Sequence, residues 1–221
     1  KVKAFAQEEG LTLPIRGKAK DLFSRLYEFD PAQVRENIAR FFEIPYTPAV
    51  KPDISDVPEV PQRPPNLCAG CSHRATYYAV KKAAEGLGTI YPTDIGCYTL
   101  GLLPPLSTAD FLLCMGSSVG TGCGFSTATD KKVISFIGDS TFFHSGTAGL
   151  LNAVYNDARF ILVILDNEIT AMTGMQPTPG LGIRADGSKG KAISLERVVA
   201  GCGVDFIKVV DPYDIQAITQ L

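Results

Sequence analysis

The fold is decided by the stretch Val133-Ile134-Ser135-Phe136-Ile137-Gly138-Asp139-Ser140. Residues 133–137 form a strand-like run, and a second such run, residues 160–165, ends in Asp166-Asn167. One helix-length stretch separates the two runs, so the segment predicts a single βαβ unit with parallel strands. Open α/β sheets bind ligands beyond the carboxyl ends of their strands, and Asp139 and Asn167 would lie together at that edge.

The residue types at this edge predict a magnesium–diphosphate site. Asp139 and Asn167 offer side-chain oxygens, and Ile169 adds its backbone carbonyl if the chain turns back after Asn167. Mg²⁺ prefers octahedral oxygen coordination and completes its shell with phosphate and water. The amides of Ser140 and Thr141, at a helix start, would donate to phosphate oxygens. Taken alone, Gly138-Asp139-Ser140 favours a helix N-cap; the recurrence of Asn167 after the next strand favours the metal.

Composition excludes several other classes of protein. The net charge is -2 with a pI near 5.7, and no basic cluster indicates a nucleic-acid surface. No apolar run reaches the roughly 20 residues that span a bilayer. The 6 cysteines lack the regular short spacing of a secreted disulfide scaffold, which indicates a reducing cytoplasm. Because the sequence opens at Lys1 and stops at Leu221, we expect it to be part of a longer chain.

Two regions are predicted along the chain. Residues 1–60 form an arm in which Asp30-Pro31 starts a helix through Phe42, and the Pro-rich stretch 45–65 reads as a tether. Residues 61–221 form the binding domain, C-terminally incomplete, with helices at 75–85 and from Ser194 to Gly201 and further strands at 89–92 and 205–210. The small residues of 115–124 would allow close approach to a ligand or another backbone. Alternating strands and helices predict an α/β fold, a parallel sheet with helices on both faces.

Four sequence motifs in this domain resemble those of a known protein family. They are Cys68-Ala-Gly-Cys71-Ser-His-Arg, Asp94-Ile-Gly-Cys97-Tyr-Thr, Gly138-Asp-Ser-Thr-Phe-Phe-His-Ser-Gly146 and Asp166-Asn-Glu-Ile-Thr-Ala-Met-Thr-Gly-Met-Gln-Pro177. Over about residues 60–221 the sequence resembles the thiamine-diphosphate-binding domain of the 2-oxoacid:ferredoxin oxidoreductase family, in its indolepyruvate branch.

The resemblance implies oxidative decarboxylation of aryl 2-oxoacids to acyl-CoA and CO2, with reduction of ferredoxin. It also implies partners: the remaining domains of the same polypeptide, a smaller beta subunit, ferredoxin, coenzyme A and an oligomeric assembly. The glutamate that activates the aminopyrimidine would come from an absent pyrimidine-binding domain, so this part alone is expected to be inactive.

The resemblance also assigns residues. Asp139, Asn167 and the Ile169 carbonyl match magnesium ligands. Cofactor contacts are implied for the two strand-end turns and three further loop segments, namely Ile95, Gly96, Cys97, Tyr98, Met115, Gly116, Ser117, Ser118, Gly138, Asp139, Ser140, Thr141, Asn167, Ile169, Ala171 and Met172.

The cysteines allow more than one interpretation. Cys68, Cys71 and Cys97 match three ligands of a [4Fe–4S] cluster in relatives with a small beta subunit, but residues 206–210 hold no fourth cysteine and Cys202 comes too early. The alternatives are a lining of the cofactor entrance or a zinc site. The resemblance places [4Fe–4S] clusters of the complete enzyme beyond Leu221.

The histidines, the arginines and the function each allow more than one interpretation. His144 follows the Gly138 turn and is a candidate catalytic residue for the substrate carboxylate or a proton relay, or equally a histidine bonded to backbone. His73 is expected to organise the Cys68–Cys71 turn. Arg74 and Arg184 are candidates for a ligand anion or for surface salt bridges. Two other functions fit the residues: a non-oxidative thiamine-dependent decarboxylase or carboligase, and a non-catalytic nucleotide- or metal-binding module.

Overall fold

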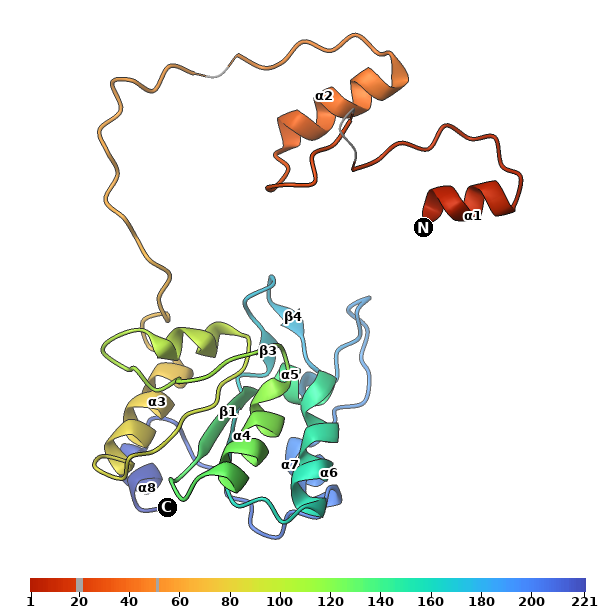
Figure 1. Ribbon diagram of the computed structural model, residues 1–221. Helices are drawn as coiled ribbons and strands as arrows, with labels where there is room; N and C mark the ends of the chain where they lie inside the picture. The colour runs from red at the N-terminus through yellow and green to blue at the C-terminus, as the bar shows by residue number, and fades with distance from the viewer. Residues whose placement is uncertain (19–21, 51) are drawn as a thin grey trace. The chain divides into compact units, whose positions relative to one another are not determined.

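The computed structural model describes residues 1–18, 22–50 and 52–221 and divides into two compact units, Lys1–Gln62 and Arg63–Leu221 (Figure 1). Residues 19–21 and 51 of the predicted arm lie outside the described residues. In chain order the elements are α1 (Val2–Glu8), α2 (Pro31–Phe42), α3 (Ser72–Ala83), η1 (Cys97–Leu102), α4 (Ser117–Ala128), β1 (Ile134–Gly138), α5 (Asp139–Thr141), η2 (Phe142–Gly146), α6 (Thr147–Tyr155), β2 (Ile161–Leu165), β3 (Ile169–Thr170), β4 (Gln176–Pro177), η3 (Pro179–Leu181), α7 (Leu195–Gly201) and α8 (Ile215–Thr219).

In the first unit, α2 begins and ends where the sequence predicts. The Asp30 carboxylate accepts the Gln33 N–H at 2.8 Å, and a proline occupies the first turn. Glu43 ends the helix in the left-handed conformation. The described residues between Glu43 and Leu67 form neither helix nor strand. The role of this stretch as a tether stays a prediction.

The second unit is built on the predicted βαβ unit. Strands β1 and β2 pair in parallel, in register from Ile134 opposite Ile161 to Gly138 opposite Leu165. Single parallel bridges, Ile90 to Val133 and Pro92 to Phe111, extend the sheet beyond β1. The prediction of a mixed α/β protein with parallel pairing is confirmed, although the regular sheet is small.

The strand predicted at residues 205–210 is wrong. Val204 and Ile207 pack against the core, but Phe206 and Val209 are 73% and 74% exposed and the segment joins no ladder. An alternating apolar run forms a strand only where a neighbouring backbone is available to pair with it.

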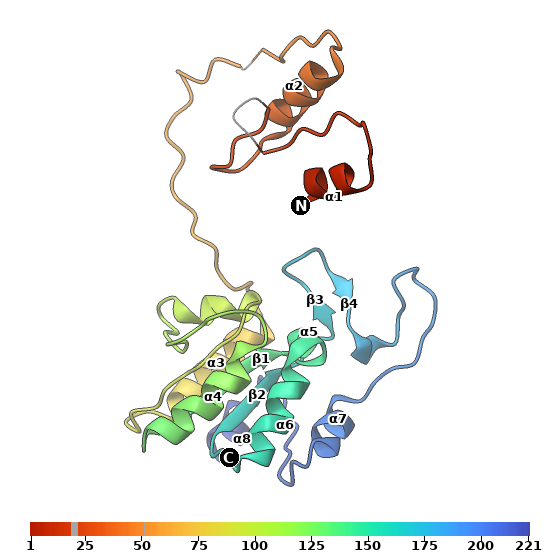
Figure 2. The ribbon, with the colours of Figure 1, turned by 45° about the vertical axis from the view of Figure 1, so that its right-hand side comes forward.

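Alternate residues of the sheet face two separate clusters of apolar side chains. Phe136 packs in one cluster with residues of α3 and α8, whereas Ile137 packs in the other with residues of α4, α6 and α7. Figures 1 and 2 show these two groups of helices on either side of β1 and β2. Both side chains are fully buried, as expected for a parallel strand covered on both faces.

Two helices meet at the carboxyl end of β1. Beyond Gly138 the chain enters α5, a π-helical turn (η2) and α6 without interruption, and such π turns recur at functional sites. Helix α4 approaches closely, because an added methyl at Gly116 or Gly122 would lie 2.2 Å from the hydroxyl oxygens of Ser145 and Ser135. The predicted close approach of the small residues 115–124 is therefore confirmed.

The predicted starts of α3 and α7 can be compared with the structure. Helix α3 begins at Ser72, three residues before the predicted start, and α7 is capped by Ser194 as predicted. Within the described part of the chain, no helix has the length and apolar character needed to cross a bilayer.

Candidate functional site

Asp139, directly after β1, is a buried carboxylate that forms no ion pair with a described residue. It is 3% exposed, and its Oδ2 atom has no hydrogen-bond partner among the described residues. Burial raises the pKa of Asp139 to about 6; the hydrogen bond from the Ser140 N–H opposes this shift, and the negative charge of Asp166 adds to it. An orphaned carboxylate oxygen in this setting is suited to a bound cation.

The loop after β2 folds back on itself. Asp166 Oδ1 accepts the Glu168 N–H at 3.0 Å, and Asn167 Oδ1 accepts the Ile169 N–H at 3.2 Å. Glu168 has a φ of 59°, in the left-handed region that non-glycine residues seldom occupy. The reversal that a contribution from the Ile169 carbonyl requires is therefore present.

The two strand-end loops touch each other. Thr170 Oγ1 donates to Ser140 Oγ at 2.7 Å, and the negative charge of Asp166 acts on Asp139. Thr178, from the following loop, is 2% exposed, and its hydroxyl also lacks a hydrogen-bond partner among the described residues. The Thr178 side chain also lowers the pKa of Asp139, so the Thr178 hydroxyl and the Asp139 carboxylate lie close together at the edge.

Asn167 lies at this edge but has its own neighbours. Its Nδ2 atom is 3.5 Å from His73 Nε2, on α3, and no hydrogen bond joins it to Asp139. An amide oxygen has two lone pairs, so Asn167 Oδ1 keeps one acceptor position beside the bond from Ile169. A cation shared by Asp139 and Asn167 stays a prediction.

Asp94 organises the site, and sequence reasoning missed it. This fully buried carboxylate accepts the N–H groups of Ile95 at 2.9 Å, Gly116 at 2.5 Å and Ser118 at 2.9 Å. It therefore ties the two predicted cofactor loops, 95–98 and 115–118, to each other. The N–H groups of Gly116 and Ser118, at the start of α4, are therefore already bonded to Asp94. They are not available to bind a phosphate. Asp94 is the first residue of the motif Asp94-Ile-Gly-Cys97-Tyr-Thr, but nothing in the spacing of that motif predicts this role.

The ring of Tyr98 packs directly against Gly138, at the turn that follows β1. Its ring is 4% exposed, and an added methyl at Gly96 or Gly138 would lie 2.3 or 2.4 Å from it. The hydroxyl oxygen lies 2.8 Å from the Ile95 carbonyl oxygen and 2.9 Å from Thr141 Oγ1. Burial raises the pKa of Tyr98 to about 12, so the phenol is neutral. The Tyr98 side chain is a buried support, in contrast to Ile95, which is exposed.

The two histidines have different environments. His144 lies in η2 and is exposed. His73 is 4% exposed, and burial lowers its pKa. His73 contacts Asn167 and meets the Tyr98 ring at an interplanar angle of 78°, with ring centroids 5.8 Å apart. Its role in organising the Cys68–Cys71 turn stays a prediction. The catalytic role predicted for His144 remains a prediction.

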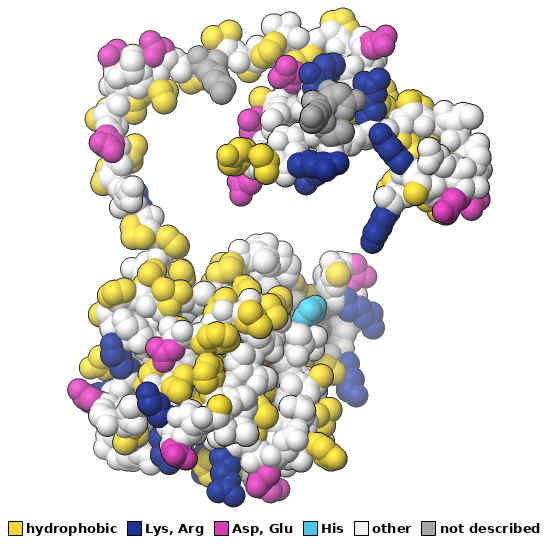
Figure 3. Space-filling view, viewed as in Figure 1, with side chains coloured by type: hydrophobic (Ala, Val, Ile, Leu, Met, Phe, Trp, Pro, Cys, Tyr) yellow, Lys and Arg dark blue, Asp and Glu magenta, His cyan; other side chains and the backbone are white. Residues whose placement is uncertain are grey.

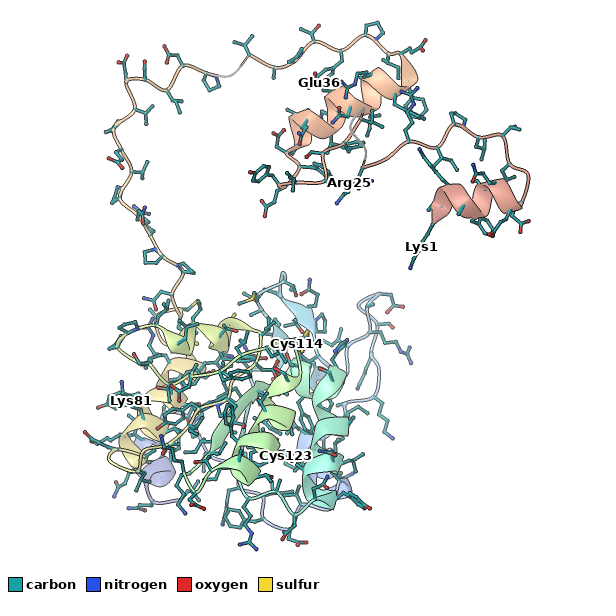
Figure 4. The ribbon with its side chains drawn as sticks, in the orientation of Figure 1. Lys1, Arg25, Glu36, Lys81, Cys114 and Cys123 are labelled. Atoms are coloured by element: carbon teal, nitrogen blue, oxygen red, sulfur yellow. The ribbon has the colours of Figure 1, made fainter. Side chains whose placement is uncertain are left out.

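The predicted cluster cysteines lie in one neighbourhood. Cys71 and Cys97 are half-buried against the same apolar cluster, and Cys68 is exposed. Burial, with the charges of Cys71 and Cys68, raises the pKa of the Cys97 thiol. Among the described residues, no three His, Cys, Asp or Glu side chains are placed to hold a metal ion. Cys114 and Cys123, on the segment leading into α4 and within α4, lie elsewhere (Figure 4).

The loops at this edge expose apolar side chains. Ala171 is half-buried. Those more than a third exposed are Ile95 (40%), Leu102 (47%), Leu113 (69%), Met115 (42%), Met172 (52%) and Met175 (63%). Figure 3 shows apolar side chains gathered on this face of the second unit. Exposure on this scale is typical of surfaces that bind a ligand or another protein domain.

The chain is similar to a protein family, to curated proteins and to a solved structure. The family model described as "Thiamine pyrophosphate enzyme, C-terminal TPP binding domain" matches residues 94–220. The chain is 51% identical over 220 residues to the indolepyruvate oxidoreductase subunit IorA of Methanothermobacter marburgensis and 45% identical over 235 residues to that of Thermococcus kodakarensis; the alignments cover 97% and 98% of this chain. It spans 35% and 36% of the length of these two relatives.

A solved structure is also similar. The 2-oxoglutarate:ferredoxin oxidoreductase from Magnetococcus marinus, with 2-oxoglutarate, coenzyme A and succinyl-CoA bound, aligns with a TM-score of 0.47 and 21% identity, over 54% of this chain and 43% of that chain.

Proposed function

We infer the function from one premise: the chain belongs to the family of thiamine pyrophosphate enzymes, as a C-terminal TPP binding domain. We propose that it binds thiamine diphosphate and Mg²⁺ within an oxidoreductase that decarboxylates aryl 2-oxoacids, such as indolepyruvate, to acyl-CoA and CO2 and reduces ferredoxin. The similarity to indolepyruvate oxidoreductase subunits, near 50% identity over almost the whole chain, supports this substrate class.

The observation that carries the proposal is the orphaned, buried Oδ2 atom of Asp139 at the carboxyl edge of the sheet. Asp139, Asn167 and the Ile169 carbonyl would hold the Mg²⁺, since all three are oxygen donors and one carries charge. Thr178 Oγ1 is a further oxygen available there. The donor set fits a diphosphate-bound magnesium ion, which brings its own phosphate oxygens.

The remaining residues of the chain would position the cofactor. Asp94 holds the 95–98 and 115–118 loops together, and Tyr98 fixes the Gly138 turn. The exposed Ile95, Met115 and Met172 would lie against the cofactor or the domain that covers it, which excludes water from the reacting atoms. Thiamine diphosphate, when bound, supplies covalent attack on the keto carbon of the 2-oxoacid and an electron sink after CO2 leaves.

The complete protein would need partners. Because the chain spans about a third of its relatives, we propose that the remaining domains of the same polypeptide provide the aminopyrimidine-activating acid and the [4Fe–4S] clusters. A smaller beta subunit, ferredoxin and coenzyme A complete the proposed cytoplasmic assembly. Whether Cys68, Cys71 and Cys97 hold a cluster would be decided by iron analysis of a protein with these three cysteines changed to serine.

Calorimetry and activity measurements test the proposal. The full-length protein is expected to bind thiamine diphosphate only with Mg²⁺, and Asp139→Ala is expected to abolish that binding while Asp110→Asn leaves it intact. Anaerobic reduction of ferredoxin or a viologen dye by indolepyruvate and coenzyme A separates the oxidoreductase from a non-oxidative decarboxylase or carboligase. Binding of ATP or NAD in place of thiamine diphosphate would instead indicate a nucleotide-binding module.

A further inference from the structure

A separate cavity lies beside the first turns of α3. Its volume is about 330 Å³, and its walls come from α3, from the η1 region and from Tyr213. It is lined by Asn66, Gly70, Cys71, Arg74, Ala75, Tyr78, Leu100, Leu103, Pro104, Pro105, Leu106 and Tyr213. This volume is within the range of small-molecule sites, and none of the lining residues is acidic.

Arg74 brings an uncompensated positive charge to this cavity. Its side chain is half-buried, and one terminal nitrogen donates to Asn66 Oδ1 at 3.1 Å and to the Leu67 carbonyl oxygen, both neutral acceptors. Its Nε atom is buried without a hydrogen-bond partner, and Arg74 forms no ion pair with any described residue. A half-buried guanidinium is ordinarily paired with an anion.

The helix itself adds positive potential at the same place. Helix α3 has 12 residues, its N-cap Cys71 makes no side-chain capping bond, and its first turn holds no acidic residue. The amino end of a helix carries a partial positive charge, so Arg74 in the first turn is unfavourable unless an anion is bound nearby.

Lys81, two turns further along α3, contributes to the rim. Its Nζ atom donates to the carbonyl oxygen of Pro105, a lining residue, at 2.8 Å, and Figure 4 shows it on the same helix. A second cation, outside the lining set, is thus bonded to one wall of the cavity.

Most of the remaining wall is apolar. Tyr78 and Tyr213 contribute aromatic rings, and Leu100 to Leu106 contribute aliphatic and proline surface. The Tyr213 hydroxyl donates to the Gly70 carbonyl oxygen at 2.6 Å, so its hydrogen is already committed. A guanidinium that forms no ion pair with a described residue, in a lining that is otherwise largely apolar, favours a ligand with one negative end and an apolar body.

We propose that this cavity binds a small monocarboxylate with an apolar body, with its carboxylate on Arg74. At about 30 Å³ for each water displaced, the cavity accommodates a molecule of roughly ten non-hydrogen atoms. The site is distinct from the cofactor edge, because none of its lining residues is among the predicted magnesium ligands or cofactor contacts. The inference therefore does not depend on the thiamine chemistry.

The test is calorimetric titration of the full-length protein with phenylacetate as the probe. Phenylacetamide, which has the same shape without the charge, and inorganic phosphate, which has the charge without the ring, are the comparison ligands. We expect phenylacetate to bind at submillimolar concentration, phenylacetamide to bind at least about tenfold more weakly and phosphate not to bind, because a charge-assisted bond contributes roughly that factor.

Two variants locate the site. Arg74→Gln is expected to weaken phenylacetate about tenfold and to leave phenylacetamide unchanged. Because Arg74 also bonds to Leu67, Ala75→Phe provides an independent variant that fills the cavity without removing the guanidinium, and it is expected to abolish both. Lys82→Gln, on the exposed side of α3, is the matched control and is expected to bind as the parent does.

Three results would overturn the inference: no heat up to 5 mM phenylacetate, equal affinity for phenylacetamide, or binding that survives both variants. Loss of phenylacetate binding in Asp139→Ala but not in Arg74→Gln would place the ligand at the cofactor edge and overturn it as well. Titrating the same samples with thiamine diphosphate and Mg²⁺ separates a failure here from a failure of the proposed function.

Discussion

At the residue scale, the buried carboxylate of Asp139 sets stability against metal binding. Its unpartnered Oδ2 carries charge at neutral pH, and neutral asparagine removes that charge with almost no change in shape. We therefore expect Asp139→Asn to stabilise the metal-free protein by about 1–2 kcal/mol at pH 7.5, and to abolish the further stabilisation that Mg²⁺ with thiamine diphosphate gives the parent. Thermal unfolding with and without Mg²⁺ and the cofactor measures both effects.

The same substitution at an exposed position provides the control. Asp110 is exposed and accepts one backbone N–H, from Tyr91 at 2.9 Å. Asp110→Asn is expected to keep the full response to Mg²⁺ with thiamine diphosphate. A metal-free Asp139→Asn protein less stable than the parent would mean that the hydrogen bonds to the carboxylate outweigh the cost of burying its charge, contrary to this reasoning.

Asp94 is expected to respond in the opposite direction. It accepts three backbone N–H groups in a fully buried position, and an asparagine amide would bring an N–H against one of those donors. We expect Asp94→Asn to lower the free energy of unfolding by about 2–4 kcal/mol and to weaken cofactor binding, because both loops lose their common anchor. Urea denaturation measures the first effect and calorimetry the second. A loss no larger than that of Asp110→Asn would contradict the anchoring role.

Sequence reasoning identified the edge of the sheet but not the side chains that organise it. Asp139 and Asn167 were predictable because each follows an apolar run, and the ends of paired parallel strands must meet. The neighbours of Asp139, by contrast, come from Asp166 and from Thr178, which has no periodic signal. Asp94 bonds to amides 22 and 24 residues away, a pairing that only the tertiary structure creates.

At the element scale, the fit between α4 and β1 depends on Gly122. An added methyl there would lie 2.2 Å from Ser135 Oγ and 2.9 Å from the Phe160 ring, whereas one at Gly124 would meet nothing within 4 Å. We expect Gly122→Ala to destabilise the protein by about 1–3 kcal/mol through overpacking, and Gly124→Ala to stabilise it by up to about 1 kcal/mol through helix propensity. Denaturation midpoints of the two variants test this, and equal shifts would show that α4 does not approach β1 so closely.

Elements with local signals were predicted well. Asp30 and Ser194 each accept an N–H three residues on, so the sequence alone locates the starts of α2 and α7. The start of α3 was placed too late because Cys71 offers no side-chain cap. Residues 205–210 have a strand-like pattern, but pairing depends on a neighbour that the pattern does not specify.

At the scale of the whole molecule, the candidate cofactor site lies entirely within the second unit, since its residues run from His73 to Thr178. The exposed apolar loops around it fit a domain that works against other domains, and this chain spans only 35% of the length of its relatives. If the predicted division into an arm (1–60) and a binding domain (61–221) holds, the binding domain should fold without the arm.

Thermolysin, which cleaves before large apolar residues, tests that division in the chain of residues 1–221. Five apolar residues of the arm are each at least 58% exposed, namely Ile44, Val50, Ile54, Val57 and Val60, and the described residues around them form neither helix nor strand. The apolar residues of β1, in contrast, are buried. Because cleavage requires a locally extended and accessible backbone, we expect the first cuts between residues 43 and 60 and a persistent fragment that ends at Leu221. Mass spectrometry of early time points identifies the cut sites. First cuts within residues 67–165 would contradict an independently folded binding domain and would favour a single cooperative unit that includes the arm.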